Sequence, residues 1–388
     1  MIGEKKKTIT TIAEKNRVID NIIEAIATKE HFLLLGHKSP DEDCVASLVG
    51  FALLVSKFGK TPTIFFSQLM TKQYEYLLNI CRYNSISIAT TFGPEDGPVD
   101  AIAIIDTPKP EMLDTNPYID SLIADDTIVT IEIDHHIGAD GAYNGQEGYL
   151  LVMEASSAAE LVGHLALKLS NRPKLLEQYQ IGELFSRNVV LALLTGIISD
   201  TNMGQFLKSR REKRYYEIFS NMFNNMLTKD TVKETNFANM KELFAELNHL
   251  TSKEEACYRR MMKKRRRSKC VAYVFLEKPE MEMLWRTYDA DTIVSVSRTV
   301  TDNLAEESGV LGMVAYYDNP DSSDLVQFRI RRSRTYKGYD LRNLLEVLSI
   351  ANGGGHEGAI GFRFPQSEIP DLKQYAADII PRIDAALG

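Results

Sequence analysis

The chain has 388 residues, of which 44% are hydrophobic and 25% charged, and its formal net charge is −8. This length corresponds to roughly two to three domains with ample apolar material for their cores. The negative charge argues against a general nucleic-acid coat protein, because such proteins are usually basic, although local basic clusters can still bind phosphates. The four cysteines lie far apart without a CxxC pair, which is typical of free thiols in a reducing compartment.

The N-terminal segment is charged and lacks the apolar run of a signal peptide. Glu24 and Lys29 interrupt the run IIEAIA, and no other segment approaches the roughly 20 apolar residues that a membrane-spanning helix needs. We therefore expect a cytoplasmic protein with no membrane partner.

The first half of the chain alternates apolar runs with helical patterns. Isoleucine and valine recur at helical spacing over residues 10–29, which predicts an amphipathic helix, and a second helix is predicted over 44–59. Continuous apolar runs separated by helices indicate a parallel sheet covered on both faces. The predicted strands are FLLLG (32–36), TPTIFF (61–66), AIAII (101–105), TIVTIEI (127–133) and a further one in GYLLVMEA (148–155).

The second half of the chain changes its pattern twice. Residues 156–226 are mostly helical, and strand patterns return from Cys270 onward in CVAYVFL, GVLGMVAYY and DLVQFRIRR. A helix in YDLRNLLEVLSIA then leads to NGGGHEGAIGF. We predict three parts: a first domain over residues 1–230, a helical linker over 231–265 and a second domain over 266–388.

Side chains that can bind metals follow three of the predicted strands and one apolar helix, VVLALLTGIISDT. Because ligands bind outside the carboxyl ends of strands in such a sheet, neighbouring strands would bring these side chains to one edge. In chain order the candidates are His37, Asp41, Asp43, Asp106, Asp134, His135, His136 and Asp200.

The number of carboxylates in this set points to bound cations. Carboxylates gathered in one cleft repel each other and take up protons unless cations neutralise them. Aspartate oxygens with one or two imidazoles suit Mn²⁺ or Mg²⁺ better than zinc–thiolate chemistry. Two ions about 3.5–4 Å apart that share one bridging carboxylate form a two-metal hydrolase centre.

Each motif also has an ordinary structural explanation. HKSPDED can be a turn in which Asp41 is the N-cap of the following helix, and Asp106-Thr107-Pro108 can be a simple strand exit. Asp134-His135-His136 is rarer, but it is a short motif. Their recurrence in order, at matching strand ends, favours a metal site over three separate explanations.

The motifs HKSPDEDCVAS, AIIDT, IDHH and GIISDT resemble the DHH phosphoesterases, and GGGHEGAIGF resembles their C-terminal DHHA1 domain. These five motifs are spread over residues 32–362, nearly the whole chain. The resemblance implies an α/β protein: an N-terminal parallel-sheet DHH domain with helices on both faces, a helical connector and a smaller C-terminal α/β DHHA1 domain. Family members often dimerise, so a homodimer is one expectation.

The resemblance further implies a site for two Mn²⁺ ions, with Mg²⁺ or Co²⁺ as alternatives. A water that bridges the two ions would lose its proton near neutral pH and attack phosphorus in line. The implied ligands are His37 and Asp41 for one ion, Asp43, His135 and Asp200 for the other, and Asp106 as the bridge between both.

Two further residues have implied roles in the chemistry. Asp134 would orient a neighbouring histidine, and His136 would face the substrate and help to stabilise the phosphoryl oxygens. No covalent nucleophile is needed in this scheme, and the sequence offers none.

The resemblance implies that the second domain binds substrate through Gly353, Gly354, Gly355, His356 and Arg332. A run of glycines lets backbone N–H groups approach a phosphate closely. The alternative is a glycine-rich turn that only links a helix to the strand AIGF. Departures from the family pattern at Asn352, Glu357-Gly358 and the strongly basic RIRRSR put the substrate in doubt.

We therefore expect a two-metal phosphodiesterase that hydrolyses short oligonucleotides or dinucleotides, such as cyclic di-AMP or its linear product pApA. A pAp phosphatase and a DHH-type inorganic pyrophosphatase are the enzyme alternatives, and a nucleotide sensor is the alternative without catalysis. The basic run RRMMKKRRRSK (259–269) allows two interpretations, a nucleic-acid contact or a solvated connector.

Overall fold

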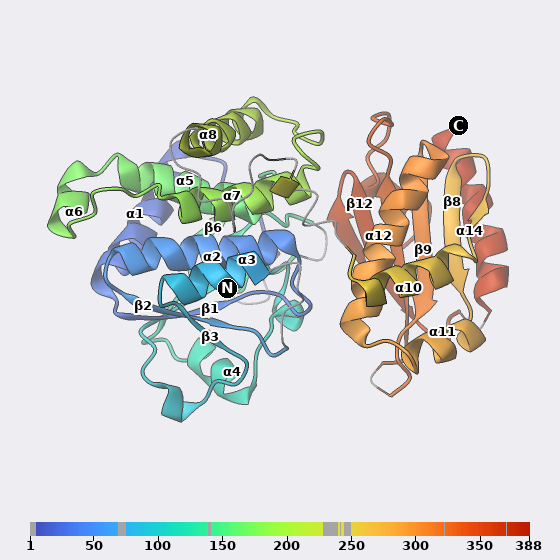
Figure 1. The fold of residues 1–388 in the computed structure, drawn as a ribbon, viewed down its shortest axis with the longest axis horizontal. Helices are drawn as coiled ribbons and strands as arrows, with labels where there is room; N and C mark the ends of the chain where they lie inside the picture. Colours follow the sequence, from blue (N-terminus) through green and yellow to red (C-terminus); the bar gives the residue numbers. More distant parts are fainter. Residues whose placement is uncertain are drawn as a thin grey trace. The chain divides into compact units, whose positions relative to one another are not determined.

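The computed structural model describes residues 5–68, 75–138, 141–227, 240, 242–243, 250–321, 323–369 and 371–388. The chain divides into two compact units, Met1–Leu247 and Asn248–Gly388 (Figure 1). Much of the predicted linker over 231–265 lies outside the described residues, and its later part forms helix α10 (Ser252–Met262) of the second unit. The predicted domain boundaries stay a prediction.

The first unit contains the predicted parallel sheet, with strand order β3-β2-β1-β4-β5-β6. All five pairings in this sheet are parallel. Its outermost strand β3 was not predicted, because three residues are too few to show an alternating pattern. The strands are β1 (His31–Leu35), β2 (Thr61–Phe65), β3 (Ser87–Ala89), β4 (Ala101–Ile105), β5 (Val129–Asp134) and β6 (Leu150–Val152).

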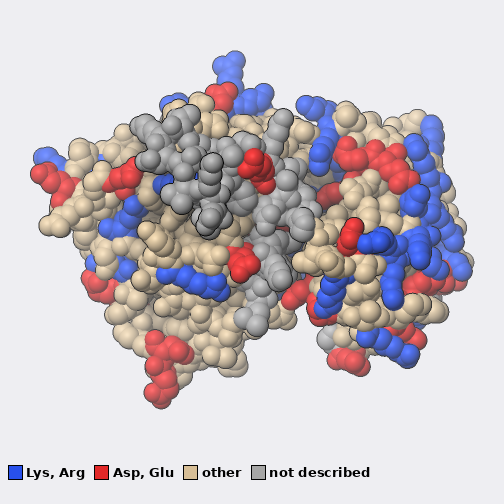
Figure 2. Space-filling view, viewed as in Figure 1, with Lys and Arg blue, Asp and Glu red and all other residues tan. Residues whose placement is uncertain are grey.

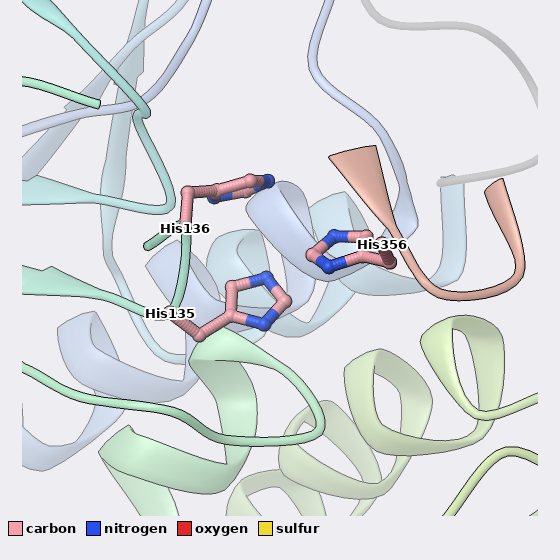
Figure 3. A group of neighbouring side chains, drawn as sticks. All are labelled: His135, His136 and His356. Carbon is pink, nitrogen blue, oxygen red and sulfur yellow. The ribbon is translucent and has the colours of Figure 1, made fainter. Parts of the chain in front are cut away.

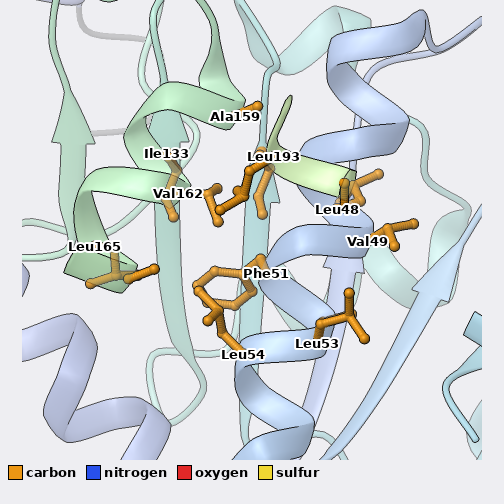
Figure 4. Packing of buried hydrophobic residues seen from close by; sticks show 14 of the residues in the cluster. Leu48, Val49, Phe51, Leu53, Leu54, Ile133, Ala159, Val162, Leu165 and Leu193 are labelled. Carbon is orange, nitrogen blue, oxygen red and sulfur yellow. The ribbon is translucent and has the colours of Figure 1, made fainter. Parts of the chain in front are cut away.

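Helices cover both faces of this sheet, as the apolar strands require. The larger layer packs on one face, and its core joins Phe51 of α2, Val162 of α5 and Leu193 of α7 (Figure 4). On the other face Ile119 of α4 (Pro117–Ile123) packs against Ile102 and Ile104. The remaining helices are α1 (Ile12–Thr28), α2 (Glu42–Lys57), α3 (Glu75–Tyr83), α5 (Ala158–Ser170), α6 (Pro173–Gln178), α7 (Arg187–Asp200) and α8 (Arg210–Leu227).

The second unit is a mixed sheet with strand order β11-β12-β10-β9-β8-β7. Only β8 and β9 pair in parallel within it. The strands are β7 (Arg266–Arg267), β8 (Val271–Leu276), β9 (Leu311–Tyr317), β10 (Leu325–Arg332), β11 (Gly353–His356) and β12 (Ala359–Pro365). With α10, the helices are α11 (Lys278–Trp285), α12 (Ala290–Ser308), α13 (Arg342–Val347) and α14 (Leu372–Leu387).

Helix α12 packs closely on β9 although the sequence did not predict it as a helix. Its Thr, Val and Ile residues have the β-branched side chains that are typical of strands. A Cβ added to Gly312 would overlap the backbone of α12, so the missing side chain permits the close approach. The predicted helix in YDLRNLLEVLSIA is shorter than expected and covers only Arg342–Val347.

The described residues contain no helix with the length and apolar character to cross a membrane.

Candidate metal centre

The carboxyl ends of three neighbouring strands gather most of the predicted metal ligands. Strands β1, β4 and β5 are adjacent and parallel, so their ends lie at one edge of the sheet. His37 follows β1, Asp106 directly follows β4, and His135 directly follows β5. The positions of these side chains are therefore set by the strand order of the sheet.

His37 lies beside two of the predicted carboxylates. Its Nε2 atom is 3.7 Å from Oδ1 of Asp41 and 3.9 Å from Oδ2 of Asp106. Its Nδ1 atom is 2.8 Å from the carbonyl oxygen of Lys38. Because a carbonyl oxygen only accepts, this contact places the ring hydrogen on Nδ1 and leaves the Nε2 lone pair toward the carboxylates.

His135 has the same arrangement with the other predicted group. Its Nε2 atom lies 3.7 Å from Oδ2 of Asp43, 3.2 Å from Oδ1 of Asp106 and 3.6 Å from Oδ2 of Asp200. Its Nδ1 atom is 3.2 Å from the carbonyl oxygen of Ala155, which again directs the lone pair of Nε2 toward the carboxylates.

Asp106 belongs to both groups, and its backbone is unusual. The residue has φ of 55°, in the left-handed region that non-glycine residues seldom adopt, and its N–H donates to the carbonyl oxygen of Ile133 at 3.0 Å. Its side chain is 2% exposed, and Oδ1 has no hydrogen-bond partner among the described residues. Backbone strain of this kind occurs at functional sites, where the surrounding structure enforces it.

Asp41 and Asp43 begin helix α2 and have different environments. Asp41 accepts a hydrogen bond from the N–H of Cys44 at 3.3 Å, so it is also the N-cap that the structural alternative predicted. Asp43 is buried and accepts from the N–H groups of Ala158 and Ala159, at 2.6 and 3.0 Å, at the start of α5. These helix-terminal donors stabilise a negative charge there.

Gly196 of α7 makes room for the Asp43 carboxylate. A Cβ added to Gly196 would overlap Oδ1 of Asp43 and Cβ of Ala159. Helix α7 can therefore pass close to the site and place Asp200 at its C-terminal end.

The protein groups alone leave this site with excess buried negative charge. Burial and the Asp106 charge raise the pKa of Asp43 to about 8, and burial and Asp43 raise the pKa of Asp200 well above its usual value. Burial opposes the charged imidazoles, yet Asp41 raises the pKa of His37 to about 9, and Asp106 raises that of His135. The site therefore favours bound positive charge, which either protons or cations can supply.

Asp134 and His136 lie beside these groups. Oδ1 of Asp134 accepts a hydrogen bond from Nδ1 of His136 at 2.8 Å, while Oδ2 accepts from the ammonium of Lys6. Figure 3 shows the rings of His135 and His136 extending from the loop after β5, and their centroids lie 4.5 Å apart. Lys6 was not predicted, because a lysine within the run KKK gives no sign of burial in the sequence.

The glycine run of the second unit forms an edge strand and not the turn of the structural alternative. Strand β11 pairs antiparallel with β12, and His356, drawn in Figure 3, is its last residue. Gly355 has φ of 138°, and a Cβ added there would overlap the backbone of Ala359. Glycine is therefore required at this position by the hairpin itself.

Arg332 lies inside the second unit, where its Nη1 donates to the carbonyl oxygen of Tyr339 at 2.6 Å and to Glu357 at 2.8 Å. Arg331 pairs with Ala359, which in turn pairs with His356, so Arg331 and His356 share one face of the sheet. Side chains alternate along a strand, and Arg332 therefore points to the opposite face. The sequence prediction did not include Arg331.

Three of the eight basic residues in the run 259–269 have acidic partners. Arg259 pairs with Glu255 at 2.8 Å, Lys264 with Glu280 at 2.6 Å, and Arg265 with Glu307 at 3.4 Å. Figure 2 shows Lys and Arg side chains next to Asp and Glu on this face of the second unit. This mixture of charges favours the solvated-connector interpretation.

Comparisons with known proteins connect this geometry with one family. Residues 31–197 match the model of the DHH family, N-terminal domain. No curated protein matches the chain.

Several solved structures resemble the chain at low sequence identity. An exopolyphosphatase-related protein from Bacteroides fragilis has a TM-score of 0.65 and 16% identity, over 96% of this chain and 97% of that chain. The pGpG-specific phosphodiesterase PggH from Vibrio cholerae has a TM-score of 0.35 and 12% identity, over 92% and 99%. RecJ in complex with Mn²⁺ from Thermus thermophilus has a TM-score of 0.43 and 12% identity, over 98% and 55%.

The first of these likenesses shows a shared fold over nearly the whole chain. The expected α/β fold is confirmed, with a parallel first sheet between helices and a second, smaller α/β unit. The first unit therefore carries the N-terminal domain of the DHH family, whose members are metal-dependent phosphoester hydrolases.

Proposed function

We propose that the protein is a Mn²⁺-dependent phosphodiesterase that cleaves short oligonucleotides or dinucleotides. The observation that carries the proposal is the pair of histidine-centred carboxylate groups that share Asp106 at one edge of the parallel sheet. The proposed substrate is a phosphodiester in a small nucleotide. Hydrolysis of the alternative substrates pAp and pyrophosphate is measured in the same test.

The residues at this edge fit a pair of divalent cations. In both His37 and His135 the Nε2 lone pair points at carboxylate oxygens, and such an arrangement repels itself unless a cation or a proton lies between the atoms. Oxygen and imidazole donors without a thiolate suit Mn²⁺ or Mg²⁺. Cys44 is buried within 4.8 Å of His37 and Asp106, but burial raises the pKa of its thiol, which disfavours the thiolate.

In this proposal His37 and Asp41 hold one ion, Asp43, His135 and Asp200 hold the other, and Asp106 serves both. When bound, the ions supply charge neutralisation for a phosphoryl group and an acidified water near neutral pH. The carbonyl oxygens of Lys38 and Ala155 fix the tautomers of His37 and His135, so each Nε2 stays directed into the site.

His136 has a separate part in the proposal, which is to contact the substrate. Its Nδ1 is occupied by Asp134, so Nε2 is the ring atom directed away from that carboxylate. A protonated Nε2 donates a hydrogen bond to a phosphoryl oxygen, where negative charge increases during in-line displacement.

The second unit contributes anion-binding groups in this proposal. The face that carries His356 also carries Arg331 and, one row along, Arg329 opposite Gly361. We therefore extend the predicted substrate set of Gly353, Gly354, Gly355, His356 and Arg332 by Arg329 and Arg331. Guanidinium groups bind phosphates through several hydrogen bonds at once.

A single comparative assay tests the function. The protein is stripped of metal with a chelator, supplied with Mn²⁺, and incubated with a short RNA, cyclic di-AMP, pApA, pAp and pyrophosphate, with chromatographic separation of the products. Turnover of RNA, pApA or cyclic di-AMP supports the proposal and identifies the linkage. Turnover of pAp or pyrophosphate alone contradicts it, and nucleotide binding with no turnover of any substrate would make the protein a sensor.

A further inference from the structure

The ammonium of Lys6 is buried and bonded to three oxygens from two segments of the first unit, strand β5 and the loop after β4. Its Nζ atom donates to the carbonyl oxygen of Thr107 at 2.6 Å, lies 2.7 Å from Oε1 of Glu132, and donates to Oδ2 of Asp134. The residue is 4% exposed. Its N–H group also donates to the carbonyl oxygen of Gly141 at 3.0 Å, which fixes the backbone beside the side chain.

These bonds satisfy the ammonium completely. An ammonium has three hydrogens and no acceptor, and here three oxygens surround it. Burial by itself would lower the pKa of Lys6, but Asp134 and Glu132 raise it, so the lysine is cationic. Breaking a buried ion pair by removing one partner is strongly destabilising, so Lys6 holds the surrounding groups in a defined arrangement.

The bond from Lys6 to Asp134 continues to His136. One oxygen of the Asp134 carboxylate is bonded to Lys6 and the other accepts from Nδ1 of His136. A carboxylate bonded at both oxygens cannot rotate freely about its side-chain torsions. The fixed carboxylate in turn fixes the orientation of the His136 imidazole to which it is bonded. These two hydrogen bonds thus connect Lys6 in the N-terminal segment, through Asp134, to His136 at the edge of the candidate metal site.

We propose that Lys6 is a positioning residue, which acts through Asp134 to hold the His136 imidazole in its working orientation. This inference rests on the proposed function, because it assigns Lys6 a role in the use of His136. It gives the N-terminal segment a part in catalysis that neither the family model over residues 31–197 nor the sequence motifs include.

Glu132 provides the matched control for this proposal. It is bonded to the same ammonium, but it also accepts from the N–H groups of Asn144 and Gly145, at 2.7 and 2.9 Å, and among the described residues it has no bond to His136. Glu132→Gln therefore weakens the same buried cluster while the bonds between Lys6, Asp134 and His136 persist. A purely structural role of Lys6 predicts equal effects of the two substitutions on activity.

The kinetic test is a double-mutant cycle with Lys6→Met and His136→Gln, measured on whichever substrate the full chain hydrolyses. We expect Lys6→Met to lower kcat by about 10–100-fold with little change in KM, as removal of a residue that orients a site group usually does. In the His136→Gln background the same substitution should change kcat by less than about twofold. The proposal would be overturned if the fold-losses in kcat of the two single variants multiplied in the double variant. It would also be overturned if Glu132→Gln lowered kcat as much as Lys6→Met.

An NMR measurement tests the positioning without any activity. In protein with ¹⁵N-labelled histidine and Mg²⁺, the wild-type His136 should carry its hydrogen on Nδ1, with the shift of a strong hydrogen bond. Lys6→Met should broaden or move this signal while Glu132→Gln leaves it unchanged. A wild-type His136 with its hydrogen on Nε2 alone contradicts the proposal even if Lys6→Met does not fold. A protein with the expected signals but no hydrolysis would instead disprove the proposed function.

Discussion

The two units handle charged side chains in opposite ways. In the first unit Asp43, Asp106 and His135 are buried at the carboxyl edge of a parallel sheet, where strand ends fix their positions. In the second unit Arg329 and Arg331 lie on one face of a mixed sheet, where the alternation along β10 fixes which way they point. The Arg331 side chain is 39% exposed and lies 3.4 Å from Asp302, and Nε of Arg329 is buried. Burial gives the first group large electrostatic coupling, while solvent partly screens Arg331.

This difference predicts the size of mutational effects. A substitution among buried, coupled carboxylates removes an interaction with no water to replace it, whereas at the partly exposed Arg331 water can replace the lost group. Effects in the first unit should therefore appear in kcat, and effects in the second mainly in KM. A substitution in the first unit that changes only KM, or one in the second unit that changes only kcat, would contradict this difference.

The largest effect is expected for Asp106→Asn. Asparagine tolerates the left-handed backbone of this residue, so the fold should persist, but the neutral amide cannot serve both histidine-centred groups. We expect kcat to fall by about 10³-fold or more, since removal of one electrostatic contact in a catalytic site has an effect of that size. Steady-state kinetics in Mn²⁺ measure kcat, and calorimetric titration measures Mn²⁺ binding. Activity within tenfold of wild type would exclude the role of Asp106 as a ligand shared by both ions.

A second test replaces Gly196 with alanine. The added methyl group would overlap the Asp43 carboxylate and Ala159, so we expect about 1–3 kcal/mol of destabilisation together with weaker Mn²⁺ binding. Gly182→Ala is the matched control, because a Cβ there meets no atom within 4 Å. Urea denaturation and Mn²⁺ titration of both variants check this, and equal behaviour of the two would show that α7 can move away from Asp43 without cost.

The contrast between the units also explains what the sequence could predict. His37, Asp106 and His135 follow apolar runs directly, and the end of a strand in a parallel sheet is a position that can be read without coordinates. The sheet face on which a strand side chain lies is harder to predict, because an error of one residue moves the side chain to the other face. Arg332 was assigned from the family resemblance, and the register of β10 places it on the face opposite to Arg331 and His356.

Lys6 was beyond sequence reasoning for a different reason. Its burial depends on Glu132 and Asp134, more than a hundred residues away, and on the carbonyl oxygen of Thr107. No local pattern in a lysine run encodes such long-range partners. Helix α12 shows the same limit in another form, since tertiary packing on β9 overrides the strand preference of its β-branched residues.

The third prediction separates Arg331 from Arg332, two of the three arginines of β10. Arg331→Gln should raise KM by about tenfold with kcat nearly unchanged, which is the size expected for one lost hydrogen bond to a charged group. Arg332→Gln should instead lower the free energy of unfolding by about 1–3 kcal/mol, because it loses its bonds to Tyr339 and Glu357. Kinetics and denaturation of both variants show which arginine binds substrate. A KM effect confined to Arg332→Gln would support the sequence prediction of Arg332.

The smallest effect is expected in the basic run. Arg266 is exposed, and the neighbouring charges at Arg265 and Lys264 already have acidic partners. If the run is a solvated connector, Arg266→Gln together with Lys263→Gln should change KM for a short RNA by less than about twofold at any salt concentration. A nucleic-acid contact would instead make KM rise steeply with salt in the wild type and flatten that dependence in the variant, because each lost phosphate contact reduces counterion release. The salt dependence of KM thus decides whether the basic run, which begins in the last turn of α10, contacts a nucleic-acid substrate.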